Sequence, residues 1–268
     1  MTVFWIILAM AALYLLALMG RNGHKDLPGL GRWFYAHRGL HGNGVPENSM
    51  AAFRLALEKG YGIELDLHLL ADGGLAVIHD ADLKRTTGAE GLIEDLTVPE
   101  LQNYHLGGTT ETIPEFSQVL ELFGGKAPMI VELKVERGNH AALCEAACKA
   151  LEGYEGAYCI ESFDPRCILW LRKNRPDIVR GQLSRNFLRD KQSNLSGPLQ
   201  FILTNLLVNF LARPDFVAYN FRERKGLSPM LCHKLWGIQG VSWTLRSKED
   251  FDTAVAEGRI PIFEGFEP

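Results

Sequence analysis

The chain has 268 residues, a formal net charge of −4 and a hydrophobic content of 47%. This length fits one large domain, alone or with an anchoring segment. The acidic balance provides no basic surface for a polyanion, so it argues against a nucleic-acid partner. An anionic substrate would depend on a few locally placed cations.

An uncharged apolar run covers residues 3–19. It reaches the lower end of the about 17–25 residues that a membrane-spanning helix needs, and it predicts a single-pass transmembrane anchor over residues 1–20. A signal peptide is one alternative, but the run lacks a cationic start and a good small-residue cleavage site. A buried core helix is the other alternative, but the run is apolar on every face.

Positive residues flank this run on its C-terminal side only. Arg21, Lys25 and Arg32 follow it, and no lysine or arginine precedes it. The positive-inside rule therefore predicts that the following domain is cytoplasmic. Residues 21–32 contain glycines and a proline, and we expect them to form a linker between anchor and domain.

Beyond residue 32, short strand-like apolar runs alternate with helical stretches. The eight expected parallel strands cover residues 33–37, 62–67, 129–133, 157–162, 178–183, 216–219, 240–244 and 260–263. Expected helices include residues 49–59, 115–123, 139–152, 165–173 and 248–257. This alternation predicts an α/β fold, and eight strands predict a TIM-type (β/α)8 barrel over residues 33–268.

One further run, residues 75–79, does not fit the alternation. Only residues 71–74 separate it from the second strand, and a parallel crossover needs a dozen or more residues. The Asp72-Gly73 pair is a hairpin signal, so we expect an antiparallel return strand outside the barrel. A two-residue turn would place Asp66 opposite His79, with their Cβ atoms about 5 Å apart. Residues from about 68 to 112 are expected to form an insertion after strand two, over the barrel mouth.

A second apolar stretch covers residues 201–211 and is too short to span a bilayer. It is compatible with a buried barrel helix. It is also compatible with a helix that lies on a membrane surface beside the anchor.

Carboxylates gather at the expected strand ends, where the active sites of such barrels lie. Glu64 and Asp66 are two residues apart, so their side chains share one face of a strand. Inward carboxylates repel each other unless a cation sits between them, and Glu132 adds a third carboxylate. An all-carboxylate set suits Mg²⁺ or Ca²⁺ rather than zinc, so the sequence predicts one divalent-cation site.

Histidines and cations accompany these acids. His37 and His79 can form an acid–base pair, because histidine titrates near neutrality. Arg38 can bind phosphate oxygens with its planar fork, and Lys134 adds a point charge. Trp243 offers a flat wall for a glycerol or choline group, or it belongs to the core. Glu47 is either a partner of this site or an ordinary turn residue.

These motifs together resemble the glycerophosphodiester phosphodiesterase family. The matching segments begin near Tyr35 and are densest before Lys134. They are Ala36-His37-Arg38-Gly39, Pro46-Glu47-Asn48-Ser49, Glu64-Leu65-Asp66, Asp72-Gly73, Val77-Ile78-His79-Asp80, Arg85-Thr86-Thr87-Gly88, Val131-Glu132-Leu133-Lys134 and Ser242-Trp243-Thr244. The resemblance implies a TIM-type barrel with an insertion, in which His37 and His79 are catalytic. It also implies that Glu64, Asp66 and Glu132 hold a divalent metal.

Two departures from the family pattern concern the substrate side of the mouth. Leu245-Arg246 follows the Trp-Thr pair where the family often has an asparagine. Phe263-Glu264-Gly265-Phe266-Glu267-Pro268 stands where the family often has Thr-Asp-x-Pro. These departures leave the head-group specificity open.

We therefore expect metal-dependent hydrolysis of glycerophosphodiesters to glycerol phosphate and an alcohol, by histidine acid–base catalysis. The sequence does not distinguish direct attack by water from a cyclic intermediate. One alternative is a lysophospholipase D that acts on membrane lysolipids, favoured by the apolar N-terminus. The other is a non-catalytic barrel that binds lipid head groups, against which the complete set of five acidic and histidine residues argues.

Overall fold

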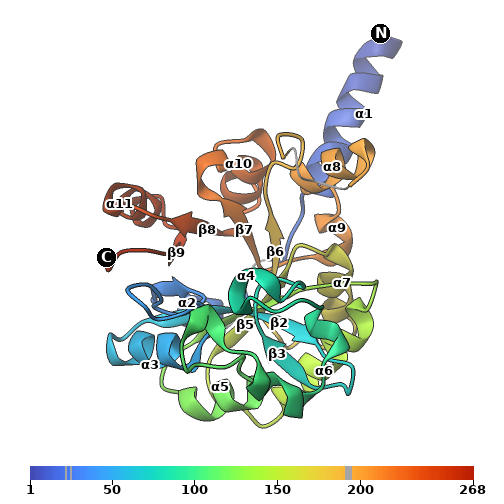
Figure 1. Cartoon of the computed structure of the whole chain (residues 1–268). Coiled ribbons are helices and arrows are strands. Elements are labelled where there is room, and N and C mark those ends of the chain that lie inside the picture. The colour runs from blue at the N-terminus through green and yellow to red at the C-terminus, as the bar shows by residue number, and fades with distance from the viewer. Residues whose placement is uncertain (22, 25, 191–194) are drawn as a thin grey trace.

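The computed structural model describes residues 1–21, 23–24, 26–190 and 195–268. In this part of the chain, eight parallel strands close into a barrel (Figure 1). Their order is β1 (Tyr35–His37), β9 (Ile260–Phe263), β8 (Gln239–Leu245), β7 (Phe216–Asn220), β6 (Arg180–Ser184), β5 (Tyr158–Ser162), β4 (Met129–Leu133) and β2 (Gly62–Leu69). Pairing of β1 with β2 closes the ring, which confirms the predicted TIM-type barrel.

Helices cover the outside of the barrel. They are α3 (Met50–Glu58), α5 (Phe116–Phe123), α6 (His140–Ala150), α7 (Pro165–Asn174), α8 (Gly197–Thr204), α9 (Asn209–Ala212), α10 (Leu227–Lys234) and α11 (Lys248–Ala256). The side chains of Ser49, Asp164 and Ser247 accept hydrogen bonds from first-turn N–H groups of α3, α7 and α11. These caps fix where each helix begins, just beyond the strand ends that carry the polar residues.

The insertion after β2 has its own apolar cluster. It contains β3 (Leu75–Val77), α4 (Lys84–Thr87) and the short 3₁₀ helices η1 (Ile93–Asp95), η2 (Val98–Asn103) and η3 (Leu106–Gly108). Buried residues Leu70, Ala76, Ile78, Leu83, Ile93, Leu101, Leu106 and Ile113 pack together within it. This packing holds the residues after β3 in place beside the barrel.

The predicted register of the β2–β3 hairpin is wrong by one residue. Asp66 lies opposite Ile78, whose N–H donates to the Asp66 carbonyl oxygen at 3.1 Å. The turn has three residues rather than two, because the Leu70 N–H donates to the Gly74 carbonyl oxygen at 2.9 Å. Gly73 adopts a left-handed conformation in this turn (φ 86°). His79 therefore lies beyond the end of β3 rather than opposite Asp66.

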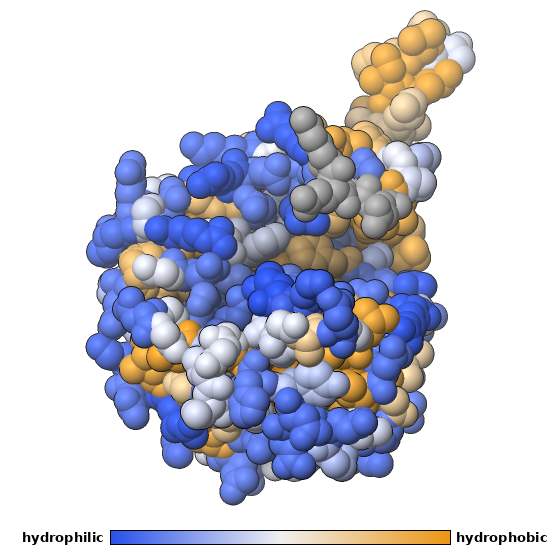
Figure 2. All heavy atoms as spheres, in the orientation of Figure 1, coloured by the Kyte–Doolittle hydropathy of each residue, from blue (hydrophilic) through white to orange (hydrophobic). Residues whose placement is uncertain are grey.

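The apolar N-terminal run forms α1 (Thr2–Ala17), which projects from the barrel beside α8 (Figure 1). Figure 2 shows apolar atoms all along the projecting part. The helix ends at Ala17, and the next residue, Leu18, is buried in a cluster with Leu206, Val217 and Tyr219. Across the described residues, no helix combines the length and the apolarity needed to cross a membrane, which differs from the predicted span.

The segment after α1 is packed against the barrel, whereas we expected a separating linker. The Arg21 guanidinium lies 2.5 Å from Oδ1 of the buried Asp215. A short helix, α2 (Leu27–Leu30), follows, and Tyr35 Oη donates to the Leu30 carbonyl oxygen at 2.9 Å. Lys25, one of the three flanking cations, lies outside the described residues.

The apolar stretch 201–211 is not one helix. It is divided between α8 and α9, with Leu206 in a left-handed conformation between them (φ 56°). Leu203 and Leu206 are buried in the barrel wall, whereas Phe201, Phe210 and Leu211 are exposed. The inner face of this stretch belongs to the core, as expected for a barrel helix, and its outer face is exposed to solvent.

Candidate active site

A cavity of about 520 Å³ lies at the carboxyl ends of the strands. Seven of the eight predicted site residues line it, namely His37, Arg38, Glu64, His79, Glu132, Lys134 and Trp243. The eighth, Asp66, is buried and ion-paired to Lys134. The barrel thus brings together residues that lie as far apart as the first and seventh strand-like runs of the sequence.

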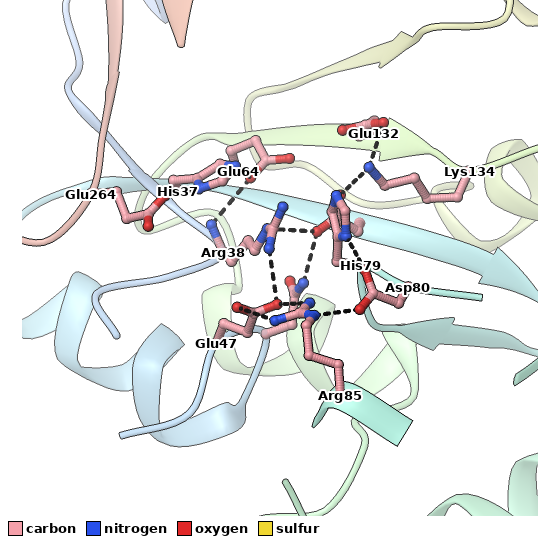
Figure 3. Close-up of polar contacts among 12 residues, drawn as sticks. His37, Arg38, Glu47, Glu64, His79, Asp80, Arg85, Glu132, Lys134 and Glu264 are labelled. Carbon is pink, nitrogen blue, oxygen red and sulfur yellow. Dashed lines mark hydrogen bonds and ion pairs between the residues drawn. The ribbon is translucent and has the colours of Figure 1, made fainter. Parts of the chain in front are cut away.

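His37, at the end of β1, is held by an acid from the other end of the chain. Its Nδ1 lies 2.7 Å from Glu264 Oε2, just beyond β9, and its Nε2 lies 3.8 Å from Glu64 Oε2 (Figure 3). The parallel pairing of Ala36 with Phe263 places the two next to each other. The sequence reasoning noted Glu264 only as a departure from the family pattern. The signal it missed is that the last strand of a closed barrel must lie beside the first.

His79 has a similar arrangement on the opposite side of the cavity. Its Nδ1 lies 2.6 Å from Asp80 Oδ1, and Asp80 is in turn ion-paired to Arg85. In both histidines the hydrogen bond at Nδ1 orients the ring and leaves Nε2 for another partner. Asp80 belongs to a quoted motif, but the sequence alone did not reveal its role.

Both imidazoles favour the neutral form. Burial lowers the pKa of His37, and the hydrogen bond to Glu264 opposes this effect only partly. Burial also lowers the pKa of His79, to about 4, although Asp66 acts in the opposite direction. At neutral pH each ring therefore carries one proton, and the carboxylate at Nδ1 favours the tautomer whose Nε2 can accept a proton.

Arg38 follows His37 in a left-handed backbone conformation (φ 55°), which is uncommon for a residue with a side chain. Its N–H donates to Glu64 Oε2 at 3.1 Å, and its Nη1 donates to Glu47 Oε1 at 2.9 Å. Glu47 also accepts hydrogen bonds from Arg85. Glu47 is thus a partner of the site, because it bridges the two arginines rather than serving only as a turn residue.

Three buried carboxylates from adjacent strands meet in the barrel. Glu64, Glu132 and Glu161 each place one oxygen within 4.8 Å of the others. Burial and mutual repulsion raise the pKa of Glu64 and Glu161 well above the usual range. Burial also raises the pKa of Glu132, to about 7, against the opposing effect of Lys134. Glu161 Oε2 is buried and has no hydrogen-bond partner within the described residues.

Asp66 has different surroundings from this trio. Lys134 Nζ lies 2.9 Å from Asp66 Oδ1 and 2.7 Å from Glu132 Oε1, and Asn48 Nδ2 donates to Asp66 Oδ2 at 2.8 Å. Burial alone would raise the pKa of Asp66, but the charge of Lys134 and other nearby cations lowers it well below the usual range. The three predicted metal ligands Glu64, Asp66 and Glu132 therefore lie in one site. The Lys134 ammonium group lies between Asp66 and Glu132.

Sequence reasoning missed Glu161. It is the only acid in the apolar strand β5, in register with Glu132 on the neighbouring strand. Its position near the strand end, like that of Glu132, was the available signal. Carboxylate oxygens are the protein ligands that a hard divalent cation prefers, and one of these oxygens is buried without a partner. The observed side chains therefore fit such an ion.

Trp243 forms part of the cavity wall and also packs against other aromatic side chains. Its ring meets that of Phe163 edge to face, with centroids 5.6 Å apart. Trp243 therefore lies both in the cavity wall and against the core, the two positions that the sequence left open. Arg185, Arg222 and Arg246 add further positive groups to the lining.

Comparison with known proteins assigns the chain to a family. Residues 37–263 match the model of the Glycerophosphoryl diester phosphodiesterase family. The chain is 37% identical over 234 residues to a glycerophosphodiester phosphodiesterase of Caldanaerobacter subterraneus subsp. tengcongensis, covering 83% of this chain and 89% of the relative. It is 44% identical over 166 residues to one from Bacillus altitudinis, covering 58% of this chain and 67% of the relative.

Solved structures show the same fold. A phosphodiesterase of Oleispira antarctica, in complex with the product sn-glycerol-3-phosphate, superposes with a TM-score of 0.71 at 21% identity, covering 87% of this chain and 92% of that chain. At this identity the likeness concerns the fold alone. The family match over most of the chain and the relative at 37% identity decide the assignment. The chain belongs to the glycerophosphoryl diester phosphodiesterase family of phosphoric diester hydrolases.

Proposed function

We propose that the chain hydrolyses glycerophosphodiesters to glycerol phosphate and an alcohol in this cavity. The observation that carries the proposal is the pair of histidines, each bound at Nδ1 by a carboxylate, beside a cluster of buried acids and cations. The names of the relatives at 37% and 44% identity support the same activity. A barrel that only binds head groups has no need for two such oriented imidazoles.

The histidines would move protons between the reacting oxygens. One neutral imidazole takes the proton of the nucleophile at its Nε2, whether this is water or a neighbouring glycerol hydroxyl. The other takes up a proton from solvent and delivers it to the leaving alkoxide oxygen. Glu264 and Asp80 keep the two rings oriented and stabilise the imidazolium form through their hydrogen bonds.

Arg38 and Lys134 would hold the phosphate. Both are partly buried and ion-paired to carboxylates, so their charges are held in place before the substrate arrives. Burial would lower the pKa of Lys134, but Asp66 and Glu132 raise it overall, so the ammonium form is maintained. A preformed cation in a site of low dielectric stabilises the charge that develops on the phosphate oxygens.

We propose that one divalent cation, Mg²⁺ or Ca²⁺, occupies the carboxylate cluster. Two sets of three ligands are candidates, and Glu64 and Glu132 belong to both. Asp66 completes the set that the sequence predicted, and Glu161 completes the set that the carboxylate distances favour. When bound, the ion would supply charge neutralisation for the phosphate. Amide variants of Asp66 and Glu161 distinguish the two sets.

Turnover of a soluble substrate tests the proposed function. The purified full chain should release choline from glycerophosphocholine, lose this activity in excess chelator and regain it when Mg²⁺ or Ca²⁺ is restored. Binding of glycerophosphocholine without turnover under all these conditions would instead identify a head-group binding barrel. Full turnover in chelator would remove the metal from the proposal.

A lysophospholipase D is the second candidate. A protein of Rattus norvegicus named lysophospholipase D GDPD1 is 33% identical over 133 residues, covering 45% of this chain and 41% of that protein. The exposed apolar residues of α1 support attachment to a membrane. We also propose that the barrel is cytoplasmic, a placement that rests on the flanking cations Arg21, Lys25 and Arg32 of the sequence. Assay of lysophosphatidylcholine beside glycerophosphocholine compares the two substrate classes.

A further inference from the structure

We infer that the mouth of the barrel lies against a lipid bilayer, held by α1 and by exposed residues after β6 and β7. This inference rests on the proposed function, because it concerns how a lipid substrate reaches the cavity described above. We call the exposed residues the mouth rim. They are Leu188, Arg189, Lys225 and Leu227.

The direction of α1 follows from its contacts with α10 and the turn after it. Tyr14 Oη lies 2.7 Å from Ser228 Oγ, near the start of α10. Beyond the end of α10, Trp236 Nε1 donates to the Leu15 carbonyl oxygen at 3.0 Å. Since α10 follows β7, its start lies on the side of the mouth and its end on the opposite side. Residues 2–13 therefore extend past the mouth side of the barrel, by about 18 Å of helix.

Several contacts attach α1 to the barrel. Leu18 is fully buried, and its carbonyl oxygen accepts a weak hydrogen bond from Cys232 Sγ at 3.7 Å. The Arg21–Asp215 ion pair follows directly after this contact. Four polar contacts between residues 14 and 21 thus hold the helix at one angle to the barrel. Because α1 and the barrel hold one relative orientation, the surroundings into which α1 inserts also determine which side of the barrel faces them.

The side chains of α1 identify a lipid environment. Its exposed large apolar residues are Val3, Phe4, Trp5, Ile6, Ile7, Leu8, Met10, Leu13 and Leu16. Consecutive positions from 3 to 8 point to every side of the helix, since each residue turns by about 100°. A protein partner or a second copy would cover one stripe, whereas hydrocarbon chains surround a helix completely. About 18 Å of projecting helix exceeds half of a hydrocarbon core of about 30 Å, so α1 can enter one leaflet deeply.

The mouth rim has the composition of a membrane contact. Leu188, on the loop that follows β6, is 52% exposed, and Leu227, the first residue of α10 after β7, is 59% exposed. Arg189 and Lys225 are exposed beside them and can meet anionic lipid head groups. Phe201 on α8 is also 52% exposed, and Figure 2 shows apolar atoms at the base of α1 in this region. Apolar and basic residues therefore occur together on the side toward which α1 projects.

This orientation deepens the proposed function by naming how the substrate enters. With α1 in the bilayer, the cavity opens toward the head-group layer. The phosphodiester of a lysophospholipid would reach the histidines while its acyl chain stays among the lipids. A soluble glycerophosphodiester would need no contact with the mouth rim. The two substrate classes should therefore respond differently to changes in the mouth rim.

A fluorescence experiment tests the orientation without using activity. Cysteine is introduced at Leu227 or, as a control, at Leu235, which is 54% exposed at the opposite end of α10. The five native cysteines are buried, so an environment-sensitive thiol dye labels the new site. The full chain is mixed with vesicles of phosphatidylcholine and phosphatidylglycerol. We expect a blue shift and quenching by nitroxide-labelled lipid at Leu227→Cys but not at Leu235→Cys.

The opposite pattern, or an equal response at both positions, would overturn the inference. A blue shift at Leu227→Cys that needs no vesicles and grows with protein concentration would also overturn it, in favour of a second copy of the chain. These readings do not depend on turnover. If the orientation is found but glycerophosphocholine and lysophosphatidylcholine are both left intact, the proposed function fails and the membrane contact stands.

An activity experiment tests the role of the mouth rim. The double variant Leu188→Ser/Leu227→Ser should lower hydrolysis of vesicle-embedded lysophosphatidylcholine by about tenfold, because it removes apolar area from the contact. Its turnover of glycerophosphocholine in solution should be unchanged, and Leu235→Ser should leave both rates unchanged. Equal rates for the double variant and the unmodified chain on vesicles would contradict the inference.

Discussion

Glu264 Oε2 lies 2.7 Å from His37 Nδ1, although 226 positions of the chain separate the two residues. The same carboxylate is ion-paired to Arg246 at 2.9 Å. Closure of the barrel thus creates a carboxylate–imidazole pair at the cavity, and Arg246 holds the carboxylate in place. The ring tautomer of His37 depends on a residue at the far end of the sequence.

Replacing Glu264 by glutamine should therefore slow catalysis more than it weakens binding. The amide no longer favours the tautomer with a proton on Nδ1, so we expect kcat on glycerophosphocholine to fall about 10–100-fold with little change in KM. Glu267→Gln, at an exposed acid paired to Lys59, is the matched control. A normal kcat for Glu264→Gln would show that His37 needs no orienting partner.

The same residue should make the stability of the fold depend on pH. Burial would raise the pKa of Glu264, but the hydrogen bond from His37 and nearby positive charge lower it from 4.5 to about 2. The ionised form is thus favoured in the folded state, so its contribution is complete above pH 4.5 and is lost as the pH falls toward 2. Urea unfolding from about pH 6 to pH 3 should show that Glu264→Gln lacks this part of the pH dependence. Parallel curves for both proteins would contradict the expectation.

Both histidines should be essential. We expect His37→Ala and His79→Ala each to lower kcat by about 10²–10⁴-fold, because each removes one proton-transfer group. Circular dichroism and the unfolding midpoint should change little. His105→Ala, at an exposed histidine of the insertion, is the control. Near-normal turnover by either cavity variant would exclude that residue from the proton transfers.

The cation ligands can be identified by titration calorimetry with Mg²⁺ and Ca²⁺. Glu132→Gln should weaken the affinity by at least about tenfold, because Glu132 belongs to both ligand sets. A comparable loss in Glu161→Gln but not in Asp66→Asn would identify Glu161 as the third ligand. The reverse pattern would identify Asp66. Glu145→Gln, at an exposed acid of α6, controls for the change in net charge. Unaltered affinity in all three cavity variants would contradict the site.

Arg21 should stabilise the barrel itself. It is the ion-pair partner of Asp215, whose side chain is completely buried, so Arg21→Ala leaves a buried carboxylate with fewer partners. We expect a loss of about 1–3 kcal/mol in the free energy of unfolding. Arg32→Ala, at an exposed arginine, should change this free energy little.

By the same argument, deleting residues 1–13 should preserve the fold, and deleting residues 1–25 should destabilise it. Equal stability of the two truncations would show that residues 14–25 do not support the barrel.

The strands were predictable because buried parallel strands are short apolar runs, and all eight were placed within about two residues. The hairpin register was not, because one extra turn residue moves every pair by one position. Glu161 and Glu264 were missed for a different reason. Each is a single acid without a local pattern, and only the neighbouring strand gives it a role. Residues with a motif around them, such as His37 and Glu64, were predicted from the sequence, and both line the cavity.

The chain of charges from Asp80 to Arg38 also has an evolutionary consequence. Arg85 pairs with Asp80 and Glu47, and Glu47 pairs with Arg38, so the insertion and the first βα loop share one alternating network. The insertion and the first βα loop therefore cannot be replaced one at a time by the corresponding segment of a relative. A chimaera that receives the insertion of a relative should keep an arginine at position 85 and a carboxylate at position 47. Otherwise His79 and Arg38 lose their supports together, and the barrel scaffold remains intact around a disordered pair of cavity residues.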